Sequence, residues 1–248
     1  TTATIFWLLA LVLIPLSALW TPTIGYFIVA GIFAPAIGQT LGYIGIERIG
    51  VARSTPIVNS APIFSSSFAV LFLGEVWTAQ NVFGTLSVII GVIILSSGKA
   101  SEGQWRKLDI LYPLVGAVAF GISTTLRKFG LSLLHIPLLG AAVTVGTAFF
   151  ILLLLILWRG GRRALKFNPV STRWLFGAAV VNTGAILSVF SALNVGKVVR
   201  VEPLIACNPL LTILWVGIFL RQIERISARI VLGALFTVMG TTLVMTAR

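Results

Sequence analysis

The segment from Arg53 to Pro62 reads R-S-T-P-I-V-N-S-A-P, and a related segment from Arg200 to Pro209 reads R-V-E-P-L-I-A-C-N-P. The arginine and both prolines of the first segment recur 147 residues later in the second. After an apolar stretch, each segment is followed by a glutamate and two glycines. These are Glu75, Gly84 and Gly91 in the first half and Glu224, Gly233 and Gly240 in the second. The pattern predicts an internal duplication.

The composition places the chain in a membrane. Of its 248 residues, 58% are hydrophobic and only 10% are charged, too little polar surface to cover a soluble globule. Continuously apolar runs of about 20 residues fit helices crossing a hydrocarbon core about 30 Å thick, whereas β-barrel strands would alternate in shorter segments. We predict an all-α polytopic membrane protein with nine spans near 4–20, 24–46, 55–74, 82–98, 110–130, 137–158, 174–194, 202–220 and 230–246.

The net charge of +12 reports membrane topology rather than nucleic-acid binding, because the basic residues lie between apolar spans instead of along one soluble face. Most of them fall in loops on one side, which the positive-inside rule assigns to the cytoplasm. That assignment puts the carboxyl end outside. We expect the protein to lie in the inner membrane of a prokaryotic cell, with lipid and a small molecule, but no nucleic acid, as its partners.

Catalytic and metal chemistry find little support in the sequence. Cys207 and His135 are the single cysteine and histidine, so no cluster of metal ligands is predicted and no cofactor is expected. His135 stands in a short turn before Pro137, away from the depth that serine–histidine catalysis in a membrane would need. An intramembrane enzyme is therefore disfavoured.

The first copy of the repeated segment predicts a kinked helix. Thr55 and Pro56 have the pattern of an N-cap followed by proline at the first helical position. Pro62 would then lie inside the helix, where it lacks an N–H for the carbonyl of Val58 and acts as a hinge. Asn59 would lie beside the kink.

The second copy predicts the same arrangement. Pro203 would open the helix, Pro209 would form the second hinge, and Asn208 would lie close to it. Five spans separate equivalent positions, so the two kinked helices would enter the membrane from opposite sides, as in an inverted repeat.

Several polar side chains within the spans have more than one reading. Gln39 and Tyr43 share a helix face and form either interhelical hydrogen bonds or a ligand contact. Arg127 and Lys128 either snorkel to the interface or line a wet cavity. Asn182 lies on the most polar face of the second half.

Two further features concern helix packing. Gly84 and Gly91, and likewise Gly233 and Gly240, lie two turns apart on one stripe, the spacing of close helix contacts. We predict that these stripes pack against neighbouring helices, and a homodimer through them is one form of that packing.

The repeated Pro-x5-Pro segment, the sequence Leu73-Gly74-Glu75 and the helix with Gly84 and Gly91 resemble the EamA-type permeases of the drug/metabolite transporter superfamily. The resemblance covers nearly the whole chain. It implies ten helices in two inverted five-helix repeats around a central cavity. Residues 1–98 would form the first repeat with four helices, its first helix missing ahead of Thr1, residues 99–109 a linker, and residues 110–248 the second repeat.

The chain departs from this family in two further ways. Its second glutamate stands in Arg221-Gln222-Ile223-Glu224 rather than in a Leu-Gly-Glu sequence. Family members keep both ends in the cytoplasm, whereas the charge pattern puts the carboxyl end outside.

The predicted function is secondary transport of a small metabolite or drug by alternating access, with a non-transporting membrane scaffold or subunit as the alternative. The predicted cavity residues are Gln39, Tyr43, Asn59, Thr124, Asn182 and Asn208, with Arg53 and Arg200 at the helix mouths. The two arginines either attract an anionic group or anchor the helices at the interface. Glu202 either neutralises Arg200 or couples transport to protons.

Overall fold

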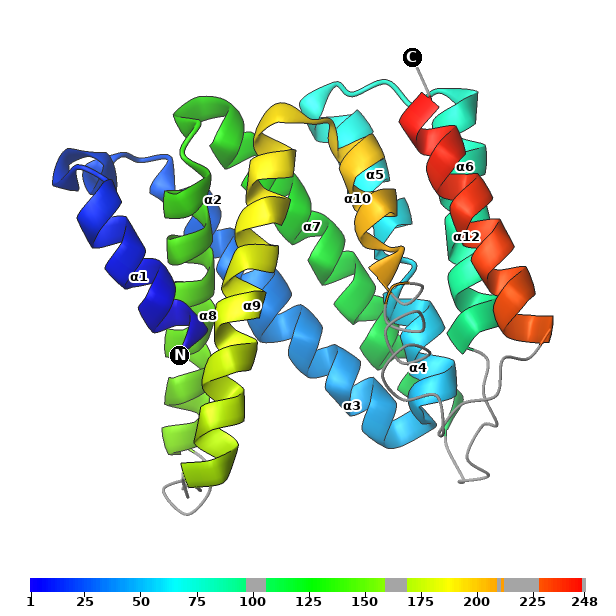
Figure 1. Ribbon diagram of the computed structural model, residues 1–248, viewed down its shortest axis with the longest axis horizontal. Helices are drawn as coiled ribbons and strands as arrows, with labels where there is room; N and C mark the ends of the chain where they lie inside the picture. The colour runs from blue at the N-terminus through cyan, green and yellow to red at the C-terminus, as the bar shows by residue number, and fades with distance from the viewer. Residues whose placement is uncertain (97–105, 159–168, 209–210, 212–227, 247–248) are drawn as a thin grey trace. The chain divides into compact units, whose positions relative to one another are not determined.

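The computed structural model describes residues 1–96, 106–158, 169–208, 211 and 228–246, and within these residues the regular structure is helical, without strands (Figure 1). The predicted all-α class is therefore confirmed. The helices are α1 Thr2–Leu13, η1 Leu16–Trp20, α2 Ile24–Gly31, η2 Ile32–Gly38, α3 Gln39–Ile49, α4 Val51–Val58, α5 Ala61–Leu73, α6 Ala79–Ser96, η3 Lys107–Ile110, α7 Leu111–Leu134, α8 Pro137–Trp158, α9 Pro169–Val195, α10 Val198–Ile205 and α12 Ala228–Thr246.

Four helical stretches of the described residues are long and apolar enough to cross a membrane: Ile24–Ile49, Lys107–Leu134, Pro137–Trp158 and Arg173–Val195. Four of the predicted spans coincide with them. The remaining predictions fall on shorter apolar helices or, for most of 202–220, outside the described residues. The total of nine spans stays a prediction.

Prolines explain where two predicted spans depart from regular α-helix. The span predicted at 4–20 is interrupted after α1, because Ile14 precedes Pro15 and takes an extended conformation with φ −119° and ψ 132°. Pro35 lies inside η2, a π-helical stretch between α2 and α3. Its nitrogen has no hydrogen to donate, and a widened turn is a common way to accommodate that gap.

The described helices fall into two compact units, residues 1–37 with 126–196 and residues 38–125 with 197–248. We call them the first and second unit. Each unit takes residues from both predicted repeats. The predicted repeats, residues 1–98 and 110–248, are defined by sequence and do not coincide with these units. The division into repeats stays a prediction.

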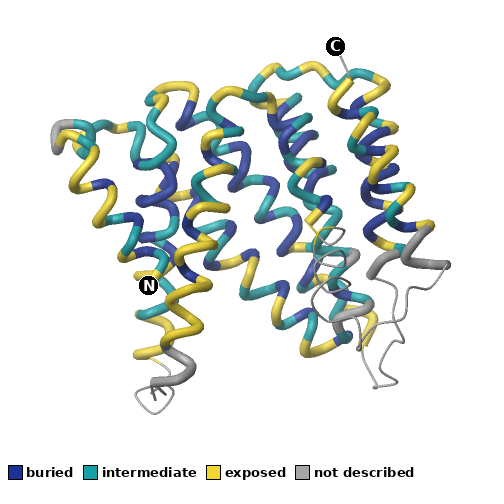
Figure 2. Tube along the Cα trace, viewed as in Figure 1, coloured by how far each residue is buried: buried dark blue, intermediate teal, exposed yellow. Residues whose placement is uncertain are grey.

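Phe27 of α2 forms the centre of the first unit and is fully buried. Two glycines make room for its ring: an added Cβ would lie 2.8 Å from the ring at Gly130 of α7 and at Gly140 of α8. Thr144 of α8 donates a 3.2 Å hydrogen bond to the carbonyl of Phe27. Long stretches of α9 remain exposed, with large apolar side chains such as Trp174, as a lipid-facing helix requires (Figure 2).

Arg127 and Lys128 of α7 also belong to the first unit, and both are half-buried. The Arg127 guanidinium lies 5.3 Å from the centroid of the Phe190 ring, a cation–π distance. Lys128 donates a 2.8 Å hydrogen bond to the carbonyl of Leu193. Both basic side chains therefore contact α9. The sequence analysis, which offered snorkelling or a wet cavity, did not predict this contact.

In the second unit α6 and α12 run antiparallel in very close contact (Figure 1). An added Cβ at Gly84 would lie 2.8 Å from the carbonyl oxygen of Gly240, and one at Gly91 would lie 2.7 Å from that of Gly233. Ser87 adds a 2.9 Å hydrogen bond to a backbone carbonyl of α12.

The predicted close packing of the glycine stripes is therefore found, but each stripe faces the other within one chain. The glycine faces themselves are occupied by this contact within the chain. A homodimer through the helices that carry them stays a prediction.

Replacing Gly240 by alanine should destabilise the protein, because its Cβ would lie 2.6 Å from the backbone oxygen of Gly84. Overpacking of this kind costs about 1–3 kcal/mol. Gly184→Ala in α9 is the matched control, since a Cβ there meets nothing within 4 Å. Unfolding in detergent should show a lower free energy of unfolding for Gly240→Ala and an unchanged one for Gly184→Ala. An equal decrease in both variants would contradict the packing of α6 against α12.

Candidate functional site

The repeated segment contains a complete helix break rather than a kink. α4 ends at Val58 and α5 begins at Ala61, so Pro62 lies in the first turn of a new helix. First-turn N–H groups have no acceptor within their helix, so proline fits there without cost, whereas the carbonyl of Val58 loses its donor. The predicted position of Pro62 inside one continuous helix is wrong.

The start of the first helix was also predicted wrongly. α4 begins at Val51, after Gly50 with φ 82° and ψ 158°, so Thr55 and Pro56 lie inside the helix and do not cap it. Only glycine adopts this backbone conformation readily. The turn at Gly50 lets α4 start five residues earlier than the N-cap pattern indicated.

The second copy breaks at the same register. α10 spans Val198–Ile205, and both of its bounds lie 147 residues after those of α4. The turns that follow the two helices have equivalent backbone hydrogen bonds. After α4, the N–H of Asn59 donates to the carbonyl of Thr55 at 2.9 Å, and the N–H of Ser60 donates to that of Ile57 at 3.1 Å. After α10, the N–H of Ala206 donates to the carbonyl of Glu202 at 3.0 Å, and the N–H of Cys207 donates to that of Leu204 at 3.2 Å. Pro203 lies inside α10 and does not open it, which corrects the prediction. Pro209 lies outside the described residues.

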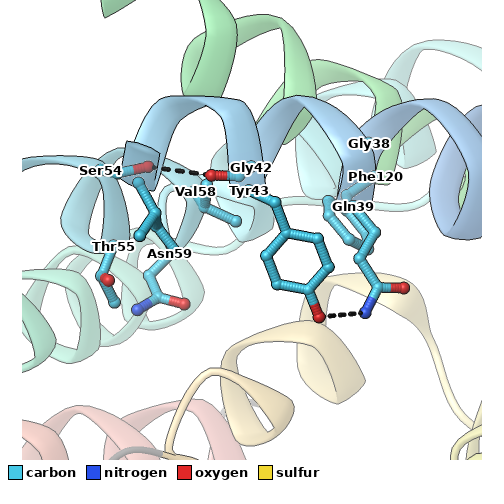
Figure 3. A pocket seen from close by; sticks show the side chains of 10 residues that line it. Gly38, Gln39, Gly42, Tyr43, Ser54, Thr55, Val58, Asn59 and Phe120 are labelled. Atoms are coloured by element: carbon cyan, nitrogen blue, oxygen red, sulfur yellow. Dashed lines mark hydrogen bonds between the residues drawn. The ribbon is translucent and has the colours of Figure 1, made fainter. Parts of the chain in front are cut away.

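A pocket of about 180 Å³ opens beside the first break, within the second unit (Figure 3). Residues of η2, α3, α4 and α7 and the break itself line it. They are Gly38, Gln39, Gly42, Tyr43, Ile46, Ser54, Thr55, Val58, Asn59 and Phe120.

Three predicted cavity residues meet in this pocket: Gln39, Tyr43 and Asn59. The Gln39 amide donates a 3.0 Å hydrogen bond to the Tyr43 hydroxyl, one helical turn away (Figure 3). Asn59 is half-buried at the turn between α4 and α5. The spacing of Gln39 and Tyr43 and the position of Asn59 beside the proline predict these residues from the sequence, and their role in binding stays a prediction.

Thr124 and Glu202 form a second polar contact in the same unit. Thr124 is only 4% exposed, and its hydroxyl donates a 2.9 Å hydrogen bond to a carboxylate oxygen of Glu202. Thr124 lies one turn beyond Phe120 on α7, and Phe120 lines the pocket. The contact joins α7 to α10.

The other predicted site residues do not line the pocket. Arg53 is half-buried in α4, and the Nε of Arg200 in α10 is buried without a hydrogen-bond partner. Asn208 is exposed just after the second break. Asn182 belongs to the first unit, where it is exposed on α9.

Glu75 supplies a contact that the sequence interpretation missed. One carboxylate oxygen accepts a 2.9 Å hydrogen bond from the N–H of Val198, and the other accepts one of 3.0 Å from the N–H of Val199. These N–H groups open α10 and have no acceptor within the helix. The carboxylate therefore caps the broken helix of the second copy and also opposes the positive end of its dipole.

The sequence Leu73-Gly74-Glu75 places this carboxylate. Gly74 ends α5 in the left-handed conformation, with φ 66° and ψ 22°, and the Glu75 N–H donates back to the carbonyl of Ala69 at 3.3 Å. This is the glycine-dependent helix end that reverses the chain direction. A glutamate directly after such a glycine was the available signal, although its partner lies 123 residues away. Glu224, its counterpart, lies outside the described residues.

Glu75→Gln should lower the free energy of unfolding by about 1–2 kcal/mol, because an amide oxygen accepts more weakly than a carboxylate and only one oxygen remains. Glu47→Gln is the matched control, since Glu47 is exposed near the end of α3. Detergent unfolding and hydrogen exchange at Val198 and Val199 measure the effect. If Glu75→Gln had the same free energy of unfolding as Glu47→Gln, the cap would contribute nothing to stability.

These features define a class. A polytopic chain whose described helices include four that are long and apolar enough to cross a membrane has the architecture of an integral membrane protein. A small pocket lies beside the break between α4 and α5. Residues 1–97 and 107–246 match the EamA-like transporter family, and the chain belongs to this family. The resemblance seen in the sequence is thereby confirmed.

The curated relatives carry transporter names. A protein named uncharacterized transporter YvbV, from Bacillus subtilis (strain 168), is 25% identical over 222 residues, which are 89% of this chain and 71% of that protein. An uncharacterized transporter from Clostridium kluyveri is 24% identical over 233 residues, 88% of this chain and 71% of that protein.

A solved crystal structure matches with a TM-score of 0.75 and 18% identity, over 98% of this chain and 83% of that chain, which shows the fold alone. Family and relatives together support a membrane transporter role for this chain.

Proposed function

We propose that the protein is a secondary transporter that moves a small metabolite or drug by alternating access, and that the pocket at the first helix break is part of the substrate path. The observation that carries the proposal is the coincidence of Gln39, Tyr43 and Asn59 with the break between α4 and α5. In a membrane, irregular backbone is tolerated where it is buried in protein or lines a water-filled cavity. Transporters place such breaks at their binding sites.

The proposal includes two inverted repeats, residues 1–98 and 110–248. The shared register of α4 and α10, with equivalent turn hydrogen bonds after each, supports a duplication of this part of the chain. In an inverted repeat the two broken helices enter from opposite sides of the membrane. The binding site can then open to one side while it stays closed to the other.

Within the second unit each polar group has a proposed role. Gln39, Tyr43 and Asn59 form hydrogen bonds with the substrate. Glu202, held by Thr124, is the proposed site of coupling to protons. Arg53, Arg200 and Asn208 remain proposed cavity residues, as does Asn182 for the first unit. The bacterial relatives support a prokaryotic inner membrane as the location.

Uptake by proteoliposomes tests the proposal. The purified protein is supplied with a mixture of amino acids, sugar phosphates, nucleotide sugars and cationic drugs, and the solutes that enter are identified by mass spectrometry. Asn59→Ala and Gln39→Ala should each reduce uptake about tenfold or more, the effect of about 1.4 kcal/mol in binding. Gln80→Ala is the matched control, because Gln80 is exposed on α6 outside the pocket.

Uptake that is unchanged in both pocket variants would remove the pocket from the substrate path. A protein that binds none of these solutes and transports none would support a membrane scaffold or subunit instead.

A further inference from the structure

The described residues that line the pocket beside the first helix break carry no ionised groups. Of its ten lining residues none carries a carboxylate, amine, guanidinium or imidazole. Its polar groups are two amides, a phenol and two hydroxyls, and the rest is aliphatic, aromatic or glycine. The arginines predicted to attract an anion, Arg53 and Arg200, are not part of the lining.

This lining decides which ligands can enter. An ionised group that leaves water for a membrane interior loses its hydration, and only an opposite charge or a full set of hydrogen bonds can replace it. The described residues of the lining offer no opposite charge. A neutral polar group loses much less and can be matched by single hydrogen bonds.

The hydrogen-bonding groups that remain are those that match an amide or hydroxyl. The Gln39 amide donates to Tyr43, which leaves the Tyr43 hydroxyl hydrogen as a donor and the Gln39 carbonyl as an acceptor. Asn59 adds a second amide. Ser54 is committed to the carbonyl of Gly42 at 3.3 Å and is fully buried. Donors and acceptors are therefore both present among the described lining residues.

Apolar residues also belong to the lining. The Phe120 ring packs on Gly38, where an added Cβ would lie 3.1 Å from the ring. Val58 and Ile46 supply aliphatic surface. At about 180 Å³ the pocket is smaller than the cavities that enclose drug-sized ligands, so a single ring or a short chain suits it.

Building on the proposed function, we propose that this pocket binds the uncharged end of its substrate: a small group with an amide or hydroxyl on an apolar ring or chain. Gln39, Tyr43 and Asn59 bind the polar part, and Phe120 contacts the apolar part. The pocket selects against carboxylate, phosphate and ammonium groups.

Three probes that share one ring test this selection: benzamide is neutral, benzoate is anionic and benzylamine is cationic at neutral pH. Binding to the purified full chain is measured by calorimetry and by thermal shift. Benzamide should bind about tenfold or more tightly than either charged probe. Gln39→Ala should weaken benzamide binding, and Gln80→Ala should leave it unchanged.

Asn59→Asp reverses the prediction by placing a carboxylate of nearly the same shape at the break. Benzylamine should then bind more tightly than benzamide, because the new charge supplies the missing partner. A variant that folds, as shown by its unchanged circular dichroism spectrum, and keeps the preference for benzamide would overturn the assignment of Asn59.

Wild-type binding of benzoate or benzylamine as tight as that of benzamide would overturn the inference, and so would the absence of binding by all three probes. Transport is read separately in proteoliposomes. Uptake of a charged solute together with benzoate binding would overturn the neutral pocket and leave the transporter proposal intact. Benzamide selectivity without uptake of any solute would support the pocket inference and contradict transport.

Discussion

Backbone hydrogen bonding in a medium without water is the constraint on which the second unit depends. An unpaired N–H or C=O in the hydrocarbon region is so costly that most membrane helices run unbroken. This chain nevertheless breaks a helix after Val58 and again after Ile205. The turns themselves satisfy some of the backbone groups, and Glu75 satisfies two N–H groups at the start of α10. Val58, the last residue of α4, lines the pocket beside the first break.

Glycine provides the space for this arrangement. Gly116 of α7 passes so close to Gly38 that an added Cβ would lie 3.0 Å from its carbonyl oxygen. That approach brings Phe120, one turn further along α7, into the pocket wall. The same principle holds α6 against α12 through four glycines. Small residues thus fix both the frame of the unit and the wall of its pocket.

Local features of the sequence could be predicted, and distant contacts could not. Hydropathy identified a helical membrane protein, and the spacing of Gln39 and Tyr43 placed them on one face. Asn59 was identified from the neighbouring proline. From the sequence Pro62 predicts a kink rather than a break, because the rule for proline inside a helix does not say whether the chain then begins a new helix. Gly50, which sets the true start of α4, carried no such signal.

The partner of Glu75 and the pairing of the glycine stripes depend on contacts across more than a hundred residues, which no spacing rule contains. The arginines at equivalent positions looked functional because they recur, yet recurrence alone does not bring a side chain into a pocket.

The most direct test of the central claim is the accessibility of Asn59 to water from the two sides of the membrane. In a Cys207→Ala background, Asn59→Cys is treated with a membrane-impermeant maleimide in right-side-out and inside-out vesicles. The proposed alternating pathway predicts labelling from both sides, whereas Phe150→Cys, on the 60% exposed apolar position of α8, is labelled from neither. Failure of Asn59→Cys to react from either side would contradict a substrate path through the helix break.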